Sequence, residues 1–210
     1  MKKLFVIFFL LAFAAFNVKA QEQKSLHYVF PDFVDAVIKF KTGADLKVKL
    51  NYNTITEEMI YLQNGKAMAI AETNKIDTVY LKDLKFVPVK EGFYQVVPVK
   101  NTPLFVRITS KAIPPPTNVG IGISQTTAQS ATSTVRTETG LYSLELPYYK
   151  IVRKNEYYLK KGDQYVRLVN ANSLALFYPE KSKEIKKYAK DNHISFDKTE
   201  DVSKLLGLID

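Results

Sequence analysis

The strongest constraint on the fold is a set of short segments in which apolar and polar residues alternate. The clearest is Leu46–Asn53, where every second residue is apolar. Successive side chains of a strand point to opposite faces of a sheet, so this period predicts one buried face and one hydrated face. The residues expected on the hydrated face are Lys47, Lys49, Asn51 and Asn53.

Similar segments recur roughly every ten residues, the spacing typical of antiparallel β folds. Further candidate strands are residues 37–41, 59–63, 66–71, 78–81, 85–89, 93–99 and 104–110. Asn64-Gly65 between two of them is typical of a two-residue type I′ hairpin. The pattern predicts a mainly β protein, α+β overall, with residues 21–113 forming an antiparallel sandwich or partly open barrel.

Three consecutive prolines, Pro114 to Pro116, end this pattern, because proline fixes φ and donates no backbone hydrogen bond. Residues 117–139 then include ten Ser and Thr residues and few charges. We interpret residues 114–140 as a Pro/Ser/Thr-rich linker or mobile loop. A glycine-hinged hairpin around residues 121–123 is the alternative.

Residues 141–210 are predicted to form a β-hairpin followed by a helical C-terminal module. Residues 157–168 read as two strands joined at Gly162-Asp163. The apolar period then changes to that of helices, with residues 180–190 as the central one. Together these helices are too short to bury a core of their own, so we expect them to pack on the hairpin or the sheet.

The helix boundaries have their own signals. Asn172 or Ser173 is expected to cap the first helix, and Pro179 suits the start of the second. Asp197 with Glu200 three residues later predicts a capping box for the last helix.

Residues 1–20 have the pattern of a secretory signal peptide. A start containing Lys2 and Lys3 precedes an uninterrupted apolar run over residues 4–16, and small residues lead up to Ala20. An uncleaved anchor is the alternative, but the run is short for a membrane helix. We expect cleavage near Ala20, a periplasmic or secreted protein, and no transmembrane span after cleavage.

Charge and cysteine content exclude several classes of function. The net charge of +9 falls to +6 when residues 1–20, with three lysines and no acid, are removed. An exported chain does not meet the genome, so we expect no nucleic-acid partner, and the remaining charge suits solubility or anionic envelope polymers. The absence of cysteine excludes disulfides, thiol nucleophiles and cysteine-ligated metals.

The sequence shows no catalytic set. His27 and His193 lack a Gly-x-Ser-x-Gly partner, and we interpret both as surface or turn residues. Glu57 and Glu58 are adjacent at a strand start, so their side chains should point apart. No metal-ligand spacing or phosphate loop is present, and we expect no cofactor.

A tyrosine-rich segment is the best candidate for binding. Strand neighbours face opposite sides, so one side of this segment is predicted to present a stacking platform to a glycan or peptide, with basic residues beside it. The candidate residues are Tyr148, Tyr149, Tyr157, Tyr158, Tyr165, Lys160 and Arg167. The alternative is that these tyrosines fill half-buried strand faces. The lysines of residues 181–190 could contact anionic lipid, but a solvated helix face is favoured.

Several short sequence segments resemble those of a group of small exported proteins of Gram-negative bacteria with no assigned activity. They are Phe30-Pro-Asp-Phe33, Leu50-Asn-Tyr52-Asn53 with Glu57-Glu58-Met59, Phe86-Val-Pro-Val89 with Phe93-Tyr94, Phe177-Tyr-Pro179, and Glu200-Asp201-Val202. The resemblance implies export and a β-rich body with a helical tail, and it transfers no catalytic residue.

These observations favour an exported, non-enzymatic envelope protein that binds a polymer or protein partner. One alternative is a structural or assembly component of an envelope complex. The third is a glycan hydrolase, which would need two carboxylates facing one cleft.

Overall fold

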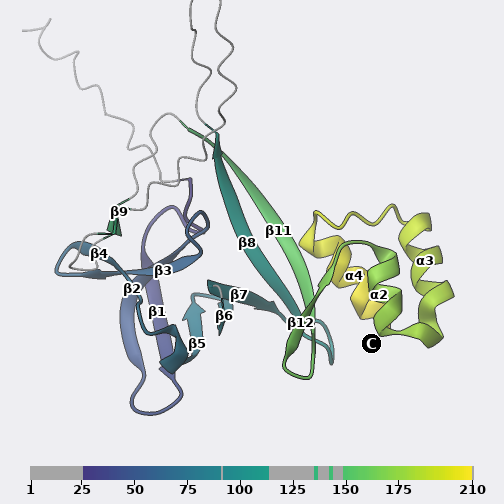
Figure 1. Ribbon diagram of the computed structural model, residues 1–210, viewed down its shortest axis with the longest axis horizontal. Coiled ribbons are helices and arrows are strands. Elements are labelled where there is room, and N and C mark those ends of the chain that lie inside the picture. The colour runs from purple at the N-terminus through teal and green to yellow at the C-terminus, as the bar shows by residue number, and fades with distance from the viewer. Residues whose placement is uncertain (1–25, 91, 114–134, 137–141, 144–148, 210) are drawn as a thin grey trace, which may run out of the picture.

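The computed structural model describes residues 26–90, 92–113, 135–136, 142–143 and 149–209 (Figure 1). The expected signal peptide, most of the expected linker and Tyr148 lie outside these residues. The strands of the main sheet are β1 (Val34–Phe40), β2 (Leu46–Asn53), β3 (Glu58–Gln63), β4 (Lys66–Ala69), β5 (Ile76–Leu81), β6 (Leu84–Val89), β7 (Gly92–Val97), β8 (Leu104–Ile113), β11 (Lys150–Lys161) and β12 (Gln164–Leu168). A separate pair joins β9 (Val135–Arg136) to β10 (Tyr142–Ser143).

The main sheet is antiparallel, with the order β12-β11-β8-β7-β6-β5-β1-β2-β3-β4. It curls far enough that the turn after β2 reaches β8, where the Ser110 amide donates to the Thr54 carbonyl at 2.7 Å. The sheet nevertheless stays open rather than closing into a barrel. The expected mainly β fold, a partly open antiparallel body with C-terminal helices, is confirmed.

The sheet continues across the expected boundary between the β domain and the C-terminal module. β11 pairs with β8 over nine residue pairs, from Lys150 with Ile113 to Tyr158 with Phe105. One core cluster contains residues from the body, the hairpin and the helices, among them Leu50, Tyr157 and Leu206. The hairpin therefore completes the same structural unit.

Burial along β2 does not follow the expected alternation: its first half is largely exposed, with Leu46 46% exposed, and its second half is fully buried. Lys47 and Lys49 are exposed, as expected, but Asn51 and Asn53 are fully buried. The segment before β1 covers them: the Asn51 side-chain amide donates to the carbonyl oxygens of Phe30 and Asp32. A polar residue that replaces water with such bonds can be buried at little cost, so the period alone misplaces it.

His27 belongs to the same covering segment. It lies in a turn, but its side chain is buried, only 4% exposed, rather than on the surface. Its carbonyl oxygen accepts bonds from the Thr54 amide and the Thr54 hydroxyl. Burial lowers the pKa of the His27 imidazole, so this group stays neutral inside the fold.

Both predicted hairpin turns are present. Asn64 and Gly65 have φ values of 52° and 75°, the left-handed conformation that a type I′ turn needs. Lys161 pairs with Gln164, which leaves Gly162-Asp163 as a two-residue connection between β11 and β12.

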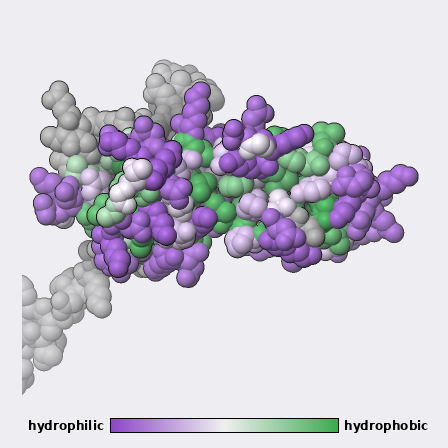
Figure 2. Space-filling view, turned by 90° about the horizontal axis from the view of Figure 1, so that it is seen from below, coloured by the Kyte–Doolittle hydropathy of each residue, from purple (hydrophilic) through white to green (hydrophobic). Residues whose placement is uncertain are grey.

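The helices are α2 (Ala171–Phe177), α3 (Ser182–Asp191) and α4 (Thr199–Ile209), with a 3₁₀ turn η2 (Pro179–Lys181) before α3. Another 3₁₀ turn, η1 (Thr73–Lys75), precedes β5. As expected, the helical module packs against the hairpin: α4 contacts β11 and α2 contacts β12, while α3 packs on α2 and α4. Seen from below, hydrophilic side chains cover both ends of the molecule, and hydrophobic surface shows between them (Figure 2).

Two expected caps are wrong. Asn170, not Asn172 or Ser173, caps α2, and it forms a reciprocal capping box with Ser173. α4 begins at Thr199, so Asp197 lies one residue before the N-cap position. Capping depends on where the backbone leaves the helix, which a three-residue spacing in the sequence does not fix.

Candidate ligand-binding site

Two rows of cross-strand neighbours define the two sides of the sheet near its β12 edge. On the core side, Val106 of β8 pairs with Tyr157 of β11, which pairs with Leu168 of β12. On the outer side, the corresponding row runs through Phe105, Tyr158 and Arg167. Adjacent residues of one strand, such as Tyr157 and Tyr158, therefore lie on opposite sides of the sheet.

Four rings form a tyrosine cluster on the outer side, made of Tyr94, Phe105, Tyr158 and Tyr165. The rings of Tyr94 and Tyr158 stack with centroids 4.8 Å apart and planes 22° apart. Tyr165 meets both Tyr94 and Phe105 edge to face, at 5.2 Å and 4.9 Å. Because these rings cover one another, the cluster is a rigid support more than an open stacking platform.

A network of charged groups lies beside the tyrosine cluster. Arg107 of β8 forms two parallel bonds to the Glu57 carboxylate, each 2.6 Å long. On its other side, Arg107 lies 3.6 Å from the carboxylate of Glu156. Glu156 also accepts bonds from Arg167 at 2.7 Å and from the Tyr158 hydroxyl at 3.1 Å. Two acids thus hold two arginines in fixed directions.

The position of Glu57 depends on an unusual turn. Its φ is 59°, uncommon for a residue other than glycine, and it places the side chain next to β8. Gly92 makes this position possible: a Cβ there would lie 2.8 Å from the Glu57 carbonyl oxygen, and φ at Gly92 is 116°. The turns before β3 and β7 therefore fit together only with glycine at residue 92.

The surroundings shift the pKa values of Arg107, Glu156 and Tyr94. The bonds to Glu57 raise the pKa of Arg107 against the effect of burial. Burial tends to raise the pKa of Glu156, but the Tyr158 bond and the charges of Arg167 and Lys154 outweigh it and lower that pKa. Burial, with Tyr158 nearby, raises the pKa of Tyr94 to about 12. At neutral pH Glu156 is therefore ionised and the Tyr94 phenol is protonated.

A pocket of about 380 Å³ adjoins this network at the end of β12, and we name it the edge pocket. It lies where β12 ends opposite Tyr157 while β11 continues, and the segment between α3 and α4 forms its far wall. Its lining includes Lys154, Asn155, Glu156, Arg167, Phe196 and Asp197. The pocket combines two aromatic residues, Tyr157 and Phe196, with charged groups of both signs.

One buried side-chain oxygen in this lining has no hydrogen-bond partner among the described residues. Asn155 donates from its side-chain nitrogen to the Thr199 hydroxyl at 3.3 Å. Its side-chain oxygen, Oδ1, is buried and accepts no hydrogen bond from the described residues. Buried acceptors are almost always satisfied, so this oxygen is suited to a donor supplied by a ligand or by water.

The structure brings only some of the predicted binding residues together. Tyr158, Tyr165 and Arg167 belong to the cluster and its network, and Lys160 lies 6.0 Å from the Tyr165 ring. Tyr157 is fully buried on the core side, with its hydroxyl 3.3 Å from that of Thr199, and it borders the edge pocket. Tyr149 precedes β11, nine residues from Tyr158 and roughly 30 Å along an extended strand.

Several residues of the site were not predicted: Glu57, Tyr94, Phe105, Arg107, Asn155 and Phe196. Their contacts join strands far apart in the chain; Glu57 and Arg107 are 50 residues apart. The alternation of β8 identifies Arg107 as an outward residue, but its partner depends on the curl of the sheet.

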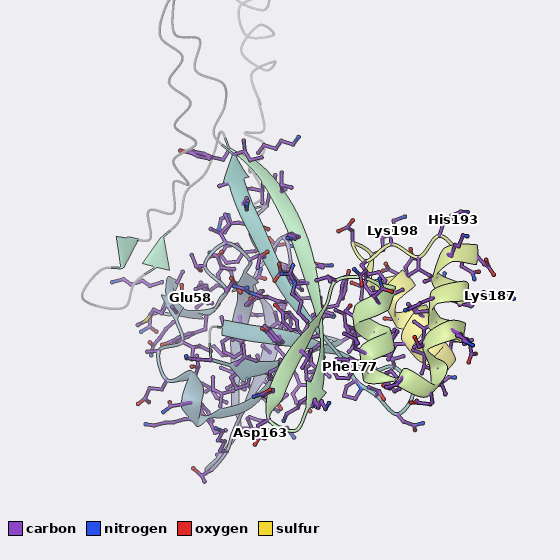
Figure 3. The ribbon with its side chains drawn as sticks, turned by 45° about the vertical axis from the view of Figure 1, so that its right-hand side comes forward. Glu58, Asp163, Phe177, Lys187, His193 and Lys198 are labelled. Carbon is purple, nitrogen blue, oxygen red and sulfur yellow. The ribbon has the colours of Figure 1, made fainter. Side chains whose placement is uncertain are left out.

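The predicted turn position of His193 is confirmed: it is exposed at the outer end of α3, away from the sheet (Figure 3). Among the described residues, no group of three or more His, Asp or Glu residues could hold a metal ion. Within the same residues no helix is long and apolar enough to cross a membrane.

Comparisons with protein families, with curated protein sequences and with solved structures find no match to this chain. The fold and the site are therefore the basis on which a function is proposed.

Proposed function

We propose that this protein is an exported binding protein without catalytic activity, and that the edge pocket binds a glycan. The observation that carries the proposal is the unpartnered Oδ1 of Asn155 in a pocket lined by charged groups and the Phe196 ring. Sugars present closely spaced hydroxyl donors and flat apolar patches, which suit a buried acceptor and an aromatic side chain.

The rigidity of the surroundings supports this proposal. Glu156, which also accepts a bond from the Tyr158 hydroxyl of the tyrosine cluster, orients Arg167, and Arg167 lines the pocket. A side chain that is already oriented loses less conformational entropy when a ligand binds. The pocket therefore has the preorganised donors and acceptors that a binding site needs.

Binding fits the chemistry better than hydrolysis does. Glu156 and Asp197 both line the pocket, which gives a hydrolase its two carboxylates. A general acid, however, needs a raised pKa to remain protonated near neutral pH. The lowered pKa of Glu156 instead favours a permanently ionised group that accepts hydrogen bonds.

The test is a glycan array probed with residues 21–210, followed by titration of the best ligand with wild type and two variants. Arg167→Ala should weaken binding about tenfold or more, because a hydrogen bond to a charged group contributes about 1.5–3 kcal/mol. Lys160→Ala is the matched control: it removes one positive charge from the same hairpin, outside the pocket lining.

Three results would contradict the proposal. Equal losses for the two variants would mean that charge alone matters, and release of reducing ends would indicate a hydrolase. Absence of any glycan signal, together with one protein captured from envelope fractions, would favour an assembly component.

A further inference from the structure

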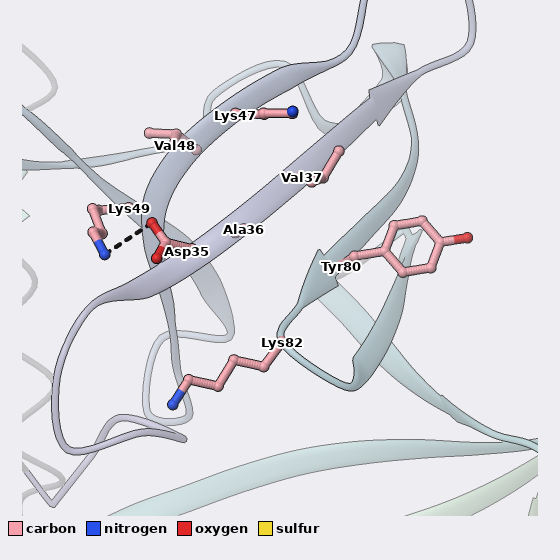
Figure 4. Close-up of a pocket in the computed structure, with 8 residues that line it drawn as sticks. All are labelled: Asp35, Ala36, Val37, Lys47, Val48, Lys49, Tyr80 and Lys82. Atoms are coloured by element: carbon pink, nitrogen blue, oxygen red, sulfur yellow. Dashed lines mark ion pairs between the residues drawn. The ribbon is translucent and has the colours of Figure 1, made fainter.

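A second hollow lies on the outer side of the sheet, over β2, β1 and β5 (Figure 4). We name it the lysine groove. Its volume is about 470 Å³, and its lining includes Asp35, Val37, Lys47, Lys49, Tyr80 and Lys82. None of these residues belongs to the edge pocket.

Positive charge dominates this groove. Lys47, Lys49 and Lys82 line it, and Asp35 is the one acid in its lining. Asp35 forms an ion pair with Lys49 at 2.8 Å, and its own side chain is 88% exposed. A pair exposed to this degree is weak, so it neutralises little of the field of the lysines.

Aromatic rings, rather than acids, orient two lysines in this region, one in the groove lining and one beside it. The Lys82 ammonium lies 5.1 Å from the centre of the Phe30 ring, and Lys39, beside the groove, lies 5.7 Å from that of Tyr80. Lys82 holds this position from a turn with φ of 51°. A cation–π contact directs an ammonium group without cancelling its charge, which leaves it free to attract an anion.

We propose that the lysine groove binds an acidic glycan chain through its sulfate, carboxylate or phosphate groups. The lysines come from different strands, and neighbouring strands lie about 4.8 Å apart, so one small anion cannot contact all of them. A polymer that carries repeated negative charges can contact several of these lysines at once. None of the apolar side chains in the lining is exposed, so the groove lacks the inserted residues that anchor a protein in a membrane.

The test uses dextran sulfate as the probe, uncharged dextran as the control polymer, and vesicles containing anionic lipid as a separate arm. The groove variant is Lys47→Gln with Lys49→Gln and Lys82→Gln, all exposed positions. The matched variant is Lys183→Gln with Lys186→Gln and Lys187→Gln, which removes the same charge from exposed positions of α3.

We expect wild type to bind dextran sulfate but not dextran, with affinity that falls as salt rises. The groove variant should bind about tenfold more weakly at low salt, and the α3 variant should differ from wild type by about twofold or less. Unfolding midpoints of both variants should match wild type, which keeps a folding defect apart from a binding defect.

Equal losses in the two triple variants would overturn the proposal, because net charge would then explain binding. Binding to vesicles without binding to dextran sulfate would show a membrane surface instead, and no binding in either arm would also overturn it. The edge pocket is tested separately: the groove variant should keep whatever glycan signal depends on Arg167.

Discussion

The charged network beside the edge pocket and the lysine groove lie on the same side of one sheet, but positive charge is paired with acids in the first and left largely unpaired in the second. A single row of cross-strand neighbours connects them: Lys47, Val37, Tyr80, Lys85, Val96, Phe105, Tyr158 and Arg167. Near the pocket, Arg107 and Arg167 are paired with Glu57 and Glu156. In the groove, Lys47 and Lys82 stand without an acid partner in the lining.

The difference shows two uses of a positive charge. A paired arginine is fixed in direction and contributes to stability and shape, whereas an unpaired lysine contributes mainly a field. Mutations at the β8–β11 end should therefore change folding stability, and mutations in the groove should change binding with little effect on stability. Four substitutions test this comparison, from the largest expected effect to the smallest.

The comparison assumes that neighbours on β11 face opposite sides, and Tyr157→Ala tests this. Tyr157 is fully buried, so its truncation should lower the free energy of unfolding by about 3–5 kcal/mol. Tyr158→Ala, on the outer side, should cost clearly less in the same urea titration. Equal costs would mean that the two sides are not distinct.

Arg107→Met tests whether paired charges stabilise the fold. It leaves the Glu57 carboxylate, 17% exposed, without its two bonds. We expect a loss of about 2 kcal/mol in urea unfolding, since a half-buried charge loses its partner. Arg167→Met, whose side chain is 46% exposed, is the control and should cost under about 1 kcal/mol.

Mild acid should act on the covering segment before it acts on Glu156. The pKa of Glu156 is lowered from its ordinary value of 4.5, so its contribution to stability is lost only around and below that pH, where the unfolded chain binds the proton first. The lowered pKa of His27 means that the unfolded chain binds a proton before the folded chain does. Stability is therefore lost as pH falls below about 6.5, and it is retained above that value.

His27→Phe removes this titration while keeping a ring. The variant should lose about 1 kcal/mol less stability than wild type between about pH 7 and pH 5, followed by chemical unfolding at each pH. His193→Asn, in an exposed turn with φ of 49°, should leave the pH profile unchanged. A His27→Phe profile parallel to wild type would contradict the neutral, buried imidazole.

Lys49→Gln should have the smallest effect on stability. The exposed pair with Asp35 contributes under about 0.5 kcal/mol, so the unfolding midpoint should hardly move. Binding of dextran sulfate should still weaken, by about twofold at low salt. A large loss of stability would show that the groove lysines, like the arginines, serve the fold.

Much of the fold follows from local patterns. Leu46–Asn53 is recognised from strict alternation, and Asn64-Gly65 from the φ values that its turn requires. Long-range contacts do not appear in such patterns. Asn51 is buried because a segment 21 residues earlier covers it, and Glu57 meets Arg107 only because the sheet curls.

The candidate site shows the same limit. Arg167 and Tyr158 were predicted from composition, because tyrosine and arginine are common in binding surfaces. Asn155 and Phe196 carry no local signal, since the pocket they line is formed by the end of β12 meeting the segment before α4. The sequence shows the alternation of Tyr157 and Tyr158 but not which side of the hairpin packs on the helices, so it does not predict that Tyr157 is the buried one of the two.

The pairing of Ile113 with Lys150 has a consequence for the evolution and engineering of this chain. The backbone leaves the sheet from β8 and returns to it in β11 at two facing positions, so both ends of the intervening stretch are fixed by the sheet itself. Because β8 and β11 hold these two positions together, the chain that joins them can be lengthened at a cost in closure entropy that grows only slowly with its length. Insertions next to Ile113 or Lys150 should therefore leave the pairing of β8 with β11 in place.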